Sequence, residues 1–179
     1  KKRGLRHALR TLGFIGPNAR AAVPVLIELV KQNKSMKDTV IEALGDIRSE
    51  QAIPVLTDIL HKGKSDIYYR ESAFTALIKI GSKNDKTLIE VLKRKSINIF
   101  LRSALKASGD FAVRFLLIAV KSPNLLVRER ATMGLGLFQS QAEVCVPVLQ
   151  ALLADTEKAV QLEAIKSLGS IGSQAKPAV

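Results

Sequence analysis

The stretch LGFIGPNARAAVPVL runs from Leu12 to Leu26, and a similar stretch, LGSIGSQAKPAV, runs from Leu168 to Val179. Both contain Leu-Gly-x-Ile-Gly, then three residues, a basic residue and small apolar residues. A chain that repeats itself at a distance is typical of proteins built from stacked supersecondary units, each packed only on its neighbours.

Further copies lie between these two stretches when the chain is aligned on the Gly of the Leu-Gly pair. The copies are HALRTLGFIG (7–16), TVIEALGDIR (39–48), SAFTALIKIG (72–81), FLRSALKASG (100–109), RATMGLGLFQ (130–139) and EAIKSLGSIG (163–172). The aligned position is occupied by Gly13, Gly45, Ile78, Lys106, Gly136 and Gly169, which gives spacings of 32, 33, 28, 30 and 33 residues. Six copies at a period of about 31 residues indicate a solenoid.

Each unit is predicted to be a pair of helices, because apolar residues recur at helical spacing in two segments per copy. The second helix carries the copies above, and the first carries residues 22–30, 52–60, 87–92, 112–120 and 145–153. Proline fits the first turn of a helix or a kink near it, as expected for Pro24, Pro54 and Pro147. Glycine at the end of the second helix can adopt a positive φ, as expected for Gly16, Gly81, Gly109 and Gly172. Recurring alanines would let neighbouring helices approach closely: Ala8, Ala43, Ala76, Ala104, Ala131 and Ala164.

These patterns predict an all-α fold, a right-handed α-α superhelix of about six helix pairs in a single array. The expected repeats are 1–16 (partial), 17–48, 49–81, 82–109, 110–139, 140–172 and 173–179 (partial). Because neither end shows a polar capping repeat, we expect the array to be a segment of a longer one.

The repeats resemble the HEAT repeat family, in the short form named after the phycobilisome lyases. That form is marked by Val-Arg-x-x-Ala-x-x-Ala-Leu-Gly-x-Ile-Gly followed by Ala-Val-Pro-x-Leu, and VRERATMGLG (127–136) with VCVPVLQALL (144–153) is the clearest copy. The third and fourth units depart most: they lack the proline, and Ile78 or Lys106 replaces the aligned glycine. The resemblance implies an armadillo-like helical solenoid that binds proteins.

The cysteine count, the apolar runs and the net charge of the chain indicate its cellular compartment and the classes of partner it could bind. One cysteine excludes an internal disulfide framework, and neither a secretory signal nor an apolar run of membrane-spanning length is apparent, so a cytoplasmic location is expected. The net charge of +12 makes nucleic acid, an anionic membrane surface or an acidic protein possible partners.

No catalytic or metal-binding constellation stands out, and we expect no cofactor. His7 and His61 are far apart and have no Cys, Asp or Glu at ligand spacing, so both are interpreted as solvated side chains. Cys145 aligns with Ala22 and is predicted to be a small core residue. The pairs Gly13/Gly16 and Gly169/Gly172 follow helices and not strands, which favours capping and packing over phosphate binding.

The second helices are expected to line the concave face of the solenoid. The first copy contributes Lys2, Arg3, Arg6, His7, Arg10 and Phe14, which make the start of this face basic. Later copies contribute residues that are mostly apolar: Ile67, Tyr68, Glu71, Thr75, Ile99, Phe100, Ser103, Leu125, Leu126, Arg130, Met133 and Leu137. The predicted partner-binding residues are Tyr68, Phe100, Leu126, Arg130 and Met133, in a groove for a helix or extended peptide. The alternative is that the irregular middle units turn these residues into the core.

The turns between first and second helices are predicted to form a basic edge. It would contain Lys31, Lys34, Lys37, Lys62, Lys64, Lys93, Arg94, Lys95 and Lys121, and the acidic turn 154–157 would end it. An anionic partner could track along this row, and any nucleic acid binding there would be independent of sequence. The alternative is that these cations only serve solubility and the helix dipoles.

The favoured function is a non-catalytic protein–protein interaction scaffold that binds a partner through the concave face. Two alternatives stay open: a basic nucleic-acid-binding solenoid, and an accessory subunit of the bilin lyase type, which is the single enzymatic alternative and rests on the resemblance alone.

Overall fold

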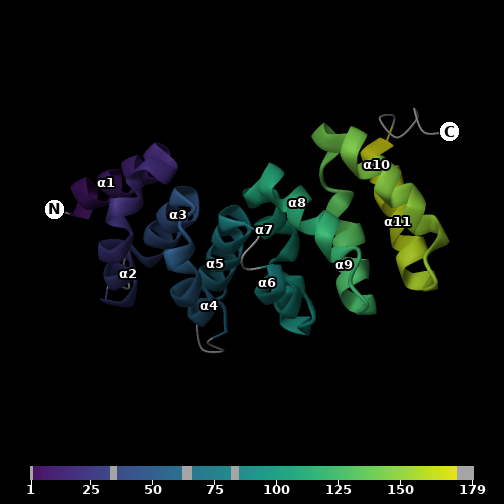
Figure 1. Ribbon diagram of the computed structural model, residues 1–179, viewed down its shortest axis with the longest axis horizontal. Helices are drawn as coiled ribbons and strands as arrows, with labels where there is room; N and C mark the ends of the chain where they lie inside the picture. The colour runs from purple at the N-terminus through teal and green to yellow at the C-terminus, as the bar shows by residue number, and fades with distance from the viewer. Residues whose placement is uncertain (1, 33–35, 62–65, 82–84, 173–179) are drawn as a thin grey trace. The chain divides into compact units, whose positions relative to one another are not determined.

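A computed structural model describes residues 2–32, 36–61, 66–81 and 85–172, without the side chains of residues 2, 95 and 96 (Figure 1). The described residues form helices joined by short turns and contain no strand. The chain divides into two compact units, Lys1–Leu88 and Ile89–Val179, and each is described by itself. The expected final repeat, 173–179, lies outside the described residues.

Unit 1 is a stack of helix pairs. Its elements are α1 (Lys2–Ile15), η1 (Gly16–Ala22), α2 (Val23–Gln32), α3 (Lys37–Ile47), η3 (Glu50–Ala52), α4 (Ile53–His61) and α5 (Ile67–Ile80). Helix α2 packs on α3, and α4 packs on α5, as a first helix packs on a second. The second helices α1, α3 and α5 also contact one another in that order, so they form one row.

Unit 2 repeats this plan less regularly. Helix α6 (Asp85–Leu92) crosses the boundary between the units, and then follow η5 (Lys95–Ile99), α7 (Leu101–Ser108), α8 (Asp110–Ala119), α9 (Leu125–Leu135), η6 (Gln139–Gln141), α10 (Ala142–Ala151), η7 (Leu152–Ala154) and α11 (Lys158–Ile171). Helix α8 packs on α7 and α9, and α11 packs on α9 and α10. The prediction of an all-α solenoid of helix pairs is confirmed.

Glycine with positive φ follows the second helix in four of the six copies, as predicted, and the second and fifth copies are the exceptions. Gly16, Gly81, Gly109 and Gly172 have φ values of 63°, 100°, 55° and 68°. In the second copy, Arg48 occupies this place with φ 55° and ψ 39°, in the left-handed region that side chains with a Cβ adopt at a cost. Pro24 and Pro54 are the second residues of α2 and α4, in the first turn, whereas Pro147 lies inside α10, beyond its first turn.

A glycine at the aligned position leaves a gap in the surface of its helix, because it has no Cβ. We call this gap a glycine notch, and the next second helix packs against it. A Cβ added at Gly45 would lie 2.7 Å from the Cα of Ala76, and one at Gly136 would lie 2.7 Å from the Cβ of Ser167. At Gly13 the Cα of Ala43 would be 3.7 Å away. In each case a small residue two positions before the next aligned position fills the notch, so successive second helices meet almost backbone to backbone.

Among the described residues, one helical segment is long and apolar enough to cross a membrane, and the bent pair Leu125–Leu135 with Gln139–Ala154 passes the same test when it is taken as one span. The single segment is Arg3–Gln32, near the N-terminus, and length and composition alone make it a weak candidate. However, its helix is interrupted at Gly16, where φ is positive, and at Ala19, whose φ and ψ are −88° and 16°.

Candidate partner-binding site

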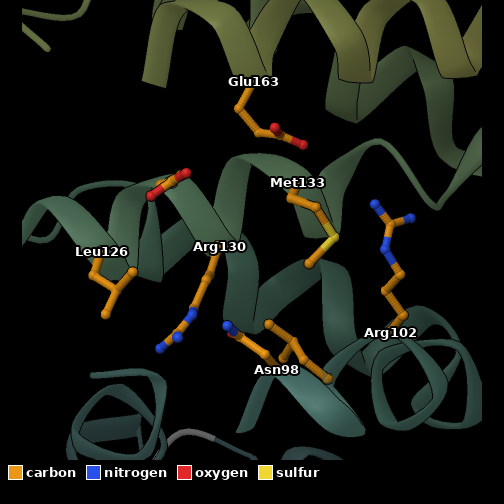
Figure 2. A pocket seen from close by; sticks show the side chains of 8 residues that line it. Asn98, Arg102, Leu126, Arg130, Met133 and Glu163 are labelled. Atoms are coloured by element: carbon orange, nitrogen blue, oxygen red, sulfur yellow. The ribbon is translucent and has the colours of Figure 1, made fainter. Parts of the chain in front are cut away.

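A pocket of about 320 Å³ opens on the second-helix face of unit 2 (Figure 2). The segment that contains η5 and α7 supplies Asn98, Leu101 and Arg102, α9 supplies Leu126, Glu129, Arg130 and Met133, and α11 supplies Glu163. Figure 2 shows Glu163 reaching from α11 toward Met133 on α9, with Arg102 at the other rim. The pocket therefore combines apolar side chains with charges of both signs.

The pocket lies where the glycine notch is lost. The aligned position of the fourth copy is Lys106, which is exposed, so α7 offers α9 no notch. Instead Gly134 on α9 faces leucine side chains: a Cβ there would lie 2.7 Å from Leu116 and 3.0 Å from Leu105. These leucines stand between α9 and its neighbours, so α7 and α9 do not meet backbone to backbone.

Arg130 lies beneath the pocket and connects α9 to the backbone near the end of α6. It is 6% exposed, and its guanidinium donates hydrogen bonds to the carbonyl oxygens of Leu92 and, at 3.0 Å, of Arg94. Leu92 is the last residue of α6, where backbone acceptors have no partner within the helix, and Arg94 lies two residues further on, where its carbonyl also accepts from the Ile97 amide. Burial lowers the pKa of Arg130, and the carboxylate of Glu129 opposes that shift. Arg130 therefore ties α9 to the end of α6.

Three of the five predicted partner-binding residues meet at the pocket: Leu126, Arg130 and Met133. Tyr68 lies on α5 in unit 1 and is 70% exposed. Phe100 is 2% exposed, so the expectation that it lines an open groove is wrong. Phe100 occupies the position six residues before the aligned one, where Thr39 and Arg130 are also buried but His7 is exposed, so burial at this position depends on the neighbouring helices of each copy.

Sequence reasoning missed Asn98, Leu101, Arg102, Glu129 and Glu163 as pocket residues. The fourth copy is short, and its second helix begins only at Leu101, after the 3-10 turn of η5. The alignment matched Arg102 with Thr132, which is buried, so nothing in the repeat pattern marked Arg102 as exposed.

The described members of the basic edge belong to both units. Lys37 lies 5.3 Å from the centroid of the Tyr69 ring, which is cation–π distance. Lys93 is paired with Glu90, while Arg94 and Lys121 are exposed, and Lys31 pairs with Glu28 at 2.8 Å. Lys34, Lys62 and Lys64 lie outside the described residues, as does the side chain of Lys95. A continuous basic row is thus a prediction that the described residues leave untested.

A salt bridge joins two successive turns of unit 2. Arg128 donates from Nε and Nη2 to the two carboxylate oxygens of Asp155, at 3.0 and 3.1 Å, and both side chains are largely buried. Arg128 also donates to the carbonyls of Ser122 and Pro123. The hydrogen bonds from Arg128 hold the pKa of Asp155 below its ordinary value. The arginine of the Val-Arg pair is thus a structural tie between repeats.

The second helices of unit 1 carry stripes of opposite charge. Arg3, Arg6 and Arg10 are exposed on α1, as predicted. Helix α3 carries Asp38, Glu42 and Asp46 at intervals of one turn, which the sequence analysis missed, and Lys79 on α5 bonds Asp46 at 2.8 Å. Although Glu42 is exposed overall, partial burial of its carboxyl raises its pKa, and Asp38 and Asp46 add to that shift. The basic start of this face therefore gives way to an acidic strip.

The residues considered for chemistry have structural surroundings. Among the described residues, no group of three or more His, Cys, Asp or Glu side chains could hold a metal ion. Cys145 is fully buried, as predicted, and burial raises the pKa of its thiol to about 11. His7 and His61 are exposed on the surface.

A comparison with protein families agrees with this architecture. A family model for HEAT repeats matches residues 2–78 and 113–179 and leaves out the segment that contains α6, η5 and α7. Two crystal structures of engineered proteins, solved by the Northeast Structural Genomics Consortium, are similar to the chain. The first is 24% identical over 97% of this chain and 92% of its own, with a TM-score of 0.43. The second is 24% identical over 94% and 54%, with a TM-score of 0.42. No curated protein matches the chain.

Proposed function

The chain belongs to the HEAT repeat family, and on that premise we propose that it is a non-catalytic scaffold that binds a protein partner through the second-helix face of unit 2. The observation that supports this most strongly is the pocket among Arg102, Leu126, Met133 and Glu163. Stacked helix pairs supply a long surface for recognition, and the loss of one glycine notch leaves a recess in it.

The proposed contact residues differ in their roles. Leu126 and Met133 are partly exposed and offer apolar surface, and Arg102 offers a charge at the rim. Arg130 is proposed to shape the pocket from below, because its guanidinium is already bound to backbone carbonyls. Tyr68 is proposed as an additional contact in unit 1.

The test is affinity capture from the source cells with wild-type protein and the double variant Leu126→Asp, Met133→Asp, read by mass spectrometry after nuclease treatment. The matched control is Ile118→Asp, which adds a carboxylate at an exposed apolar residue of α8 outside the pocket. We expect one protein to be retained by wild type and control and lost from the double variant, with unchanged circular dichroism. Equal retention by all three proteins would contradict the proposal.

Nucleic acid binding is a second candidate, favoured by the net charge of +12 and by the exposed Arg3, Arg6 and Arg10 on α1. Random-sequence duplex DNA, titrated at several salt concentrations, tests it by fluorescence anisotropy. Binding through these arginines should weaken steeply with salt and fall further in the triple Arg→Gln variant. Absence of binding at low salt would remove this candidate.

A further inference from the structure

Building on the proposed function, we propose that the pocket of unit 2 takes a segment of an acidic partner in which a carboxylate side chain lies beside an apolar one. The carboxylate pairs with Arg102, and the apolar side chain packs on Leu126 and Met133. The pocket volume of about 320 Å³ is near the lower end of the range for ligand sites, roughly 300–1,000 Å³. It therefore suits one or two side chains of a longer segment.

The charged side chains that line the pocket differ in whether they already have a hydrogen-bond or ion-pair partner. Arg130 is bound to the carbonyls of Leu92 and Arg94, and Glu163 is paired with Lys166 at 3.4 Å. Glu129 acts electrostatically on its neighbour Arg130. Arg102, by contrast, is exposed and has no hydrogen bond or ion pair to any residue that the structure describes. It is the charged group at the pocket that a partner can pair with at least cost.

The surroundings of the pocket favour an anion over a cation. Lys106 lies one turn beyond Arg102 on α7 and is exposed, and Lys166 is exposed on α11. The whole chain carries 28 basic and 16 acidic residues, so its field attracts acidic partners and speeds their encounter. A basic segment could pair with Glu129 only by approaching Arg102 and Lys106.

The apolar side chains of the pocket are the reason that the proposed partner segment carries an apolar side chain beside its carboxylate. Met133 and Leu126 lie on one face of α9, separated by two turns, and both are partly exposed. Burying such side chains against an apolar partner group contributes about 25 cal/mol per Å². A carboxylate alone would leave this surface in water, so an acidic and apolar pair fits better than an acidic run.

The test uses short, capped, fluorescein-labelled peptides that alternate Glu-Leu, Glu-Ser or Lys-Leu, titrated by anisotropy against the full chain. We expect the Glu-Leu peptide to bind roughly tenfold more tightly than either of the others. The variant Arg102→Gln should weaken Glu-Leu binding roughly tenfold, which is about 1.4 kcal/mol. The matched control Lys121→Gln removes an equal charge from an exposed position of the same unit outside the pocket and should change it less than twofold.

Three results would overturn the inference: no binding of the Glu-Leu peptide, preference for Lys-Leu, or equal losses in Arg102→Gln and Lys121→Gln. The last would mean general charge attraction and no pairing with Arg102. Failure here is distinguishable from failure of the proposed function. If partner capture still depends on Leu126 and Met133, the scaffold proposal stands and the acidic segment alone is wrong.

Discussion

The rows of second helices in the two units are packed by different means. In unit 1, α1, α3 and α5 contact one another through glycine notches, where Gly13 faces Ala43 and Gly45 faces Ala76. In unit 2, α9 and α11 keep this contact through Gly136 and Ser167, but α7 has Lys106 at the aligned position. Leu105 and Leu116 then face α9, and Arg130 reaches the end of α6.

This difference shows how a repeat protein gains a site. Where the notch is present, successive second helices close on each other almost backbone to backbone. Where it is lost, longer side chains set the separation, and a pocket opens among Arg102, Met133 and Glu163. The segment with the least typical repeat sequence is thus the one beside the recess.

The largest expected effect comes from filling a notch of unit 1. Gly45→Ala would place a Cβ 2.7 Å from the backbone of Ala76, so the two helices must separate. We expect a loss of about 2–3 kcal/mol in the free energy of unfolding, measured with denaturant, because overpacking outweighs the gain in helix propensity.

The matched control is the aligned Gly169→Ala, whose Cβ would meet nothing within 4 Å. It should raise the free energy of unfolding by about 0.5 kcal/mol through helix propensity alone. Equal effects of the two substitutions would mean that the notches do not set the spacing of the helices.

The next largest loss of stability is expected from removing the salt bridge between Arg128 and Asp155 in unit 2. Asp155→Ala leaves Arg128 without its carboxylate and removes the acceptor of the Glu157 amide at 2.9 Å, so we expect a loss of about 2 kcal/mol. Because the folded pKa of Asp155 is lowered, its contribution is complete above the unfolded pKa of about 4 and is lost as pH falls below it. The stability gap between wild type and variant should therefore shrink on acidification through that range. A gap independent of pH would contradict the role of the ion pair.

Removing the arginine beneath the pocket should cost less. Arg130→Met keeps an apolar stem but removes the donor to the Leu92 carbonyl and one of the two donors to the Arg94 carbonyl, which still accepts from the Ile97 amide, for a loss of about 1–2 kcal/mol. Amide exchange in the last turn of α6 should speed up, while exchange in α11 stays unchanged. Ser72→Ala, on α5 of unit 1 at the repeat position that corresponds to Arg130, is the control and should have little effect. Uniform acceleration across unit 2 would mean that Arg130 is a general core residue.

The smallest expected effect is an increase in stability. Arg48→Gly replaces the one described non-glycine residue with positive φ by the residue that other copies carry there. Removing the strain of the Cβ should raise the free energy of unfolding by about 0.5–1 kcal/mol. A decrease would show that contacts of the Arg48 side chain outweigh its backbone strain.

The repeat pattern predicts the fold well because each helix pair is specified locally. Gly16 and Gly109 end their helices with positive φ, and Pro24 and Pro54 begin theirs, since these conformations depend on the residue itself. The site is harder to predict because it depends on neighbours. Phe100 and Arg130 seemed exposed by alignment, but their burial is set by the adjacent helices. Arg102 escaped notice because the short fourth copy shifts the start of α7.

The most direct test of the central claim is a photocrosslinking scan with p-benzoylphenylalanine, introduced singly at Met133, Leu126, Ile118 and Val144. The last two are exposed apolar residues of α8 and α10 outside the pocket, so they report non-specific contact. We predict that the probes at 133 and 126 crosslink one protein partner in the source cells, and that those at 118 and 144 do not. Crosslinks to that partner from 118 or 144, with none from 133 or 126, would contradict the assignment of the pocket as the binding site.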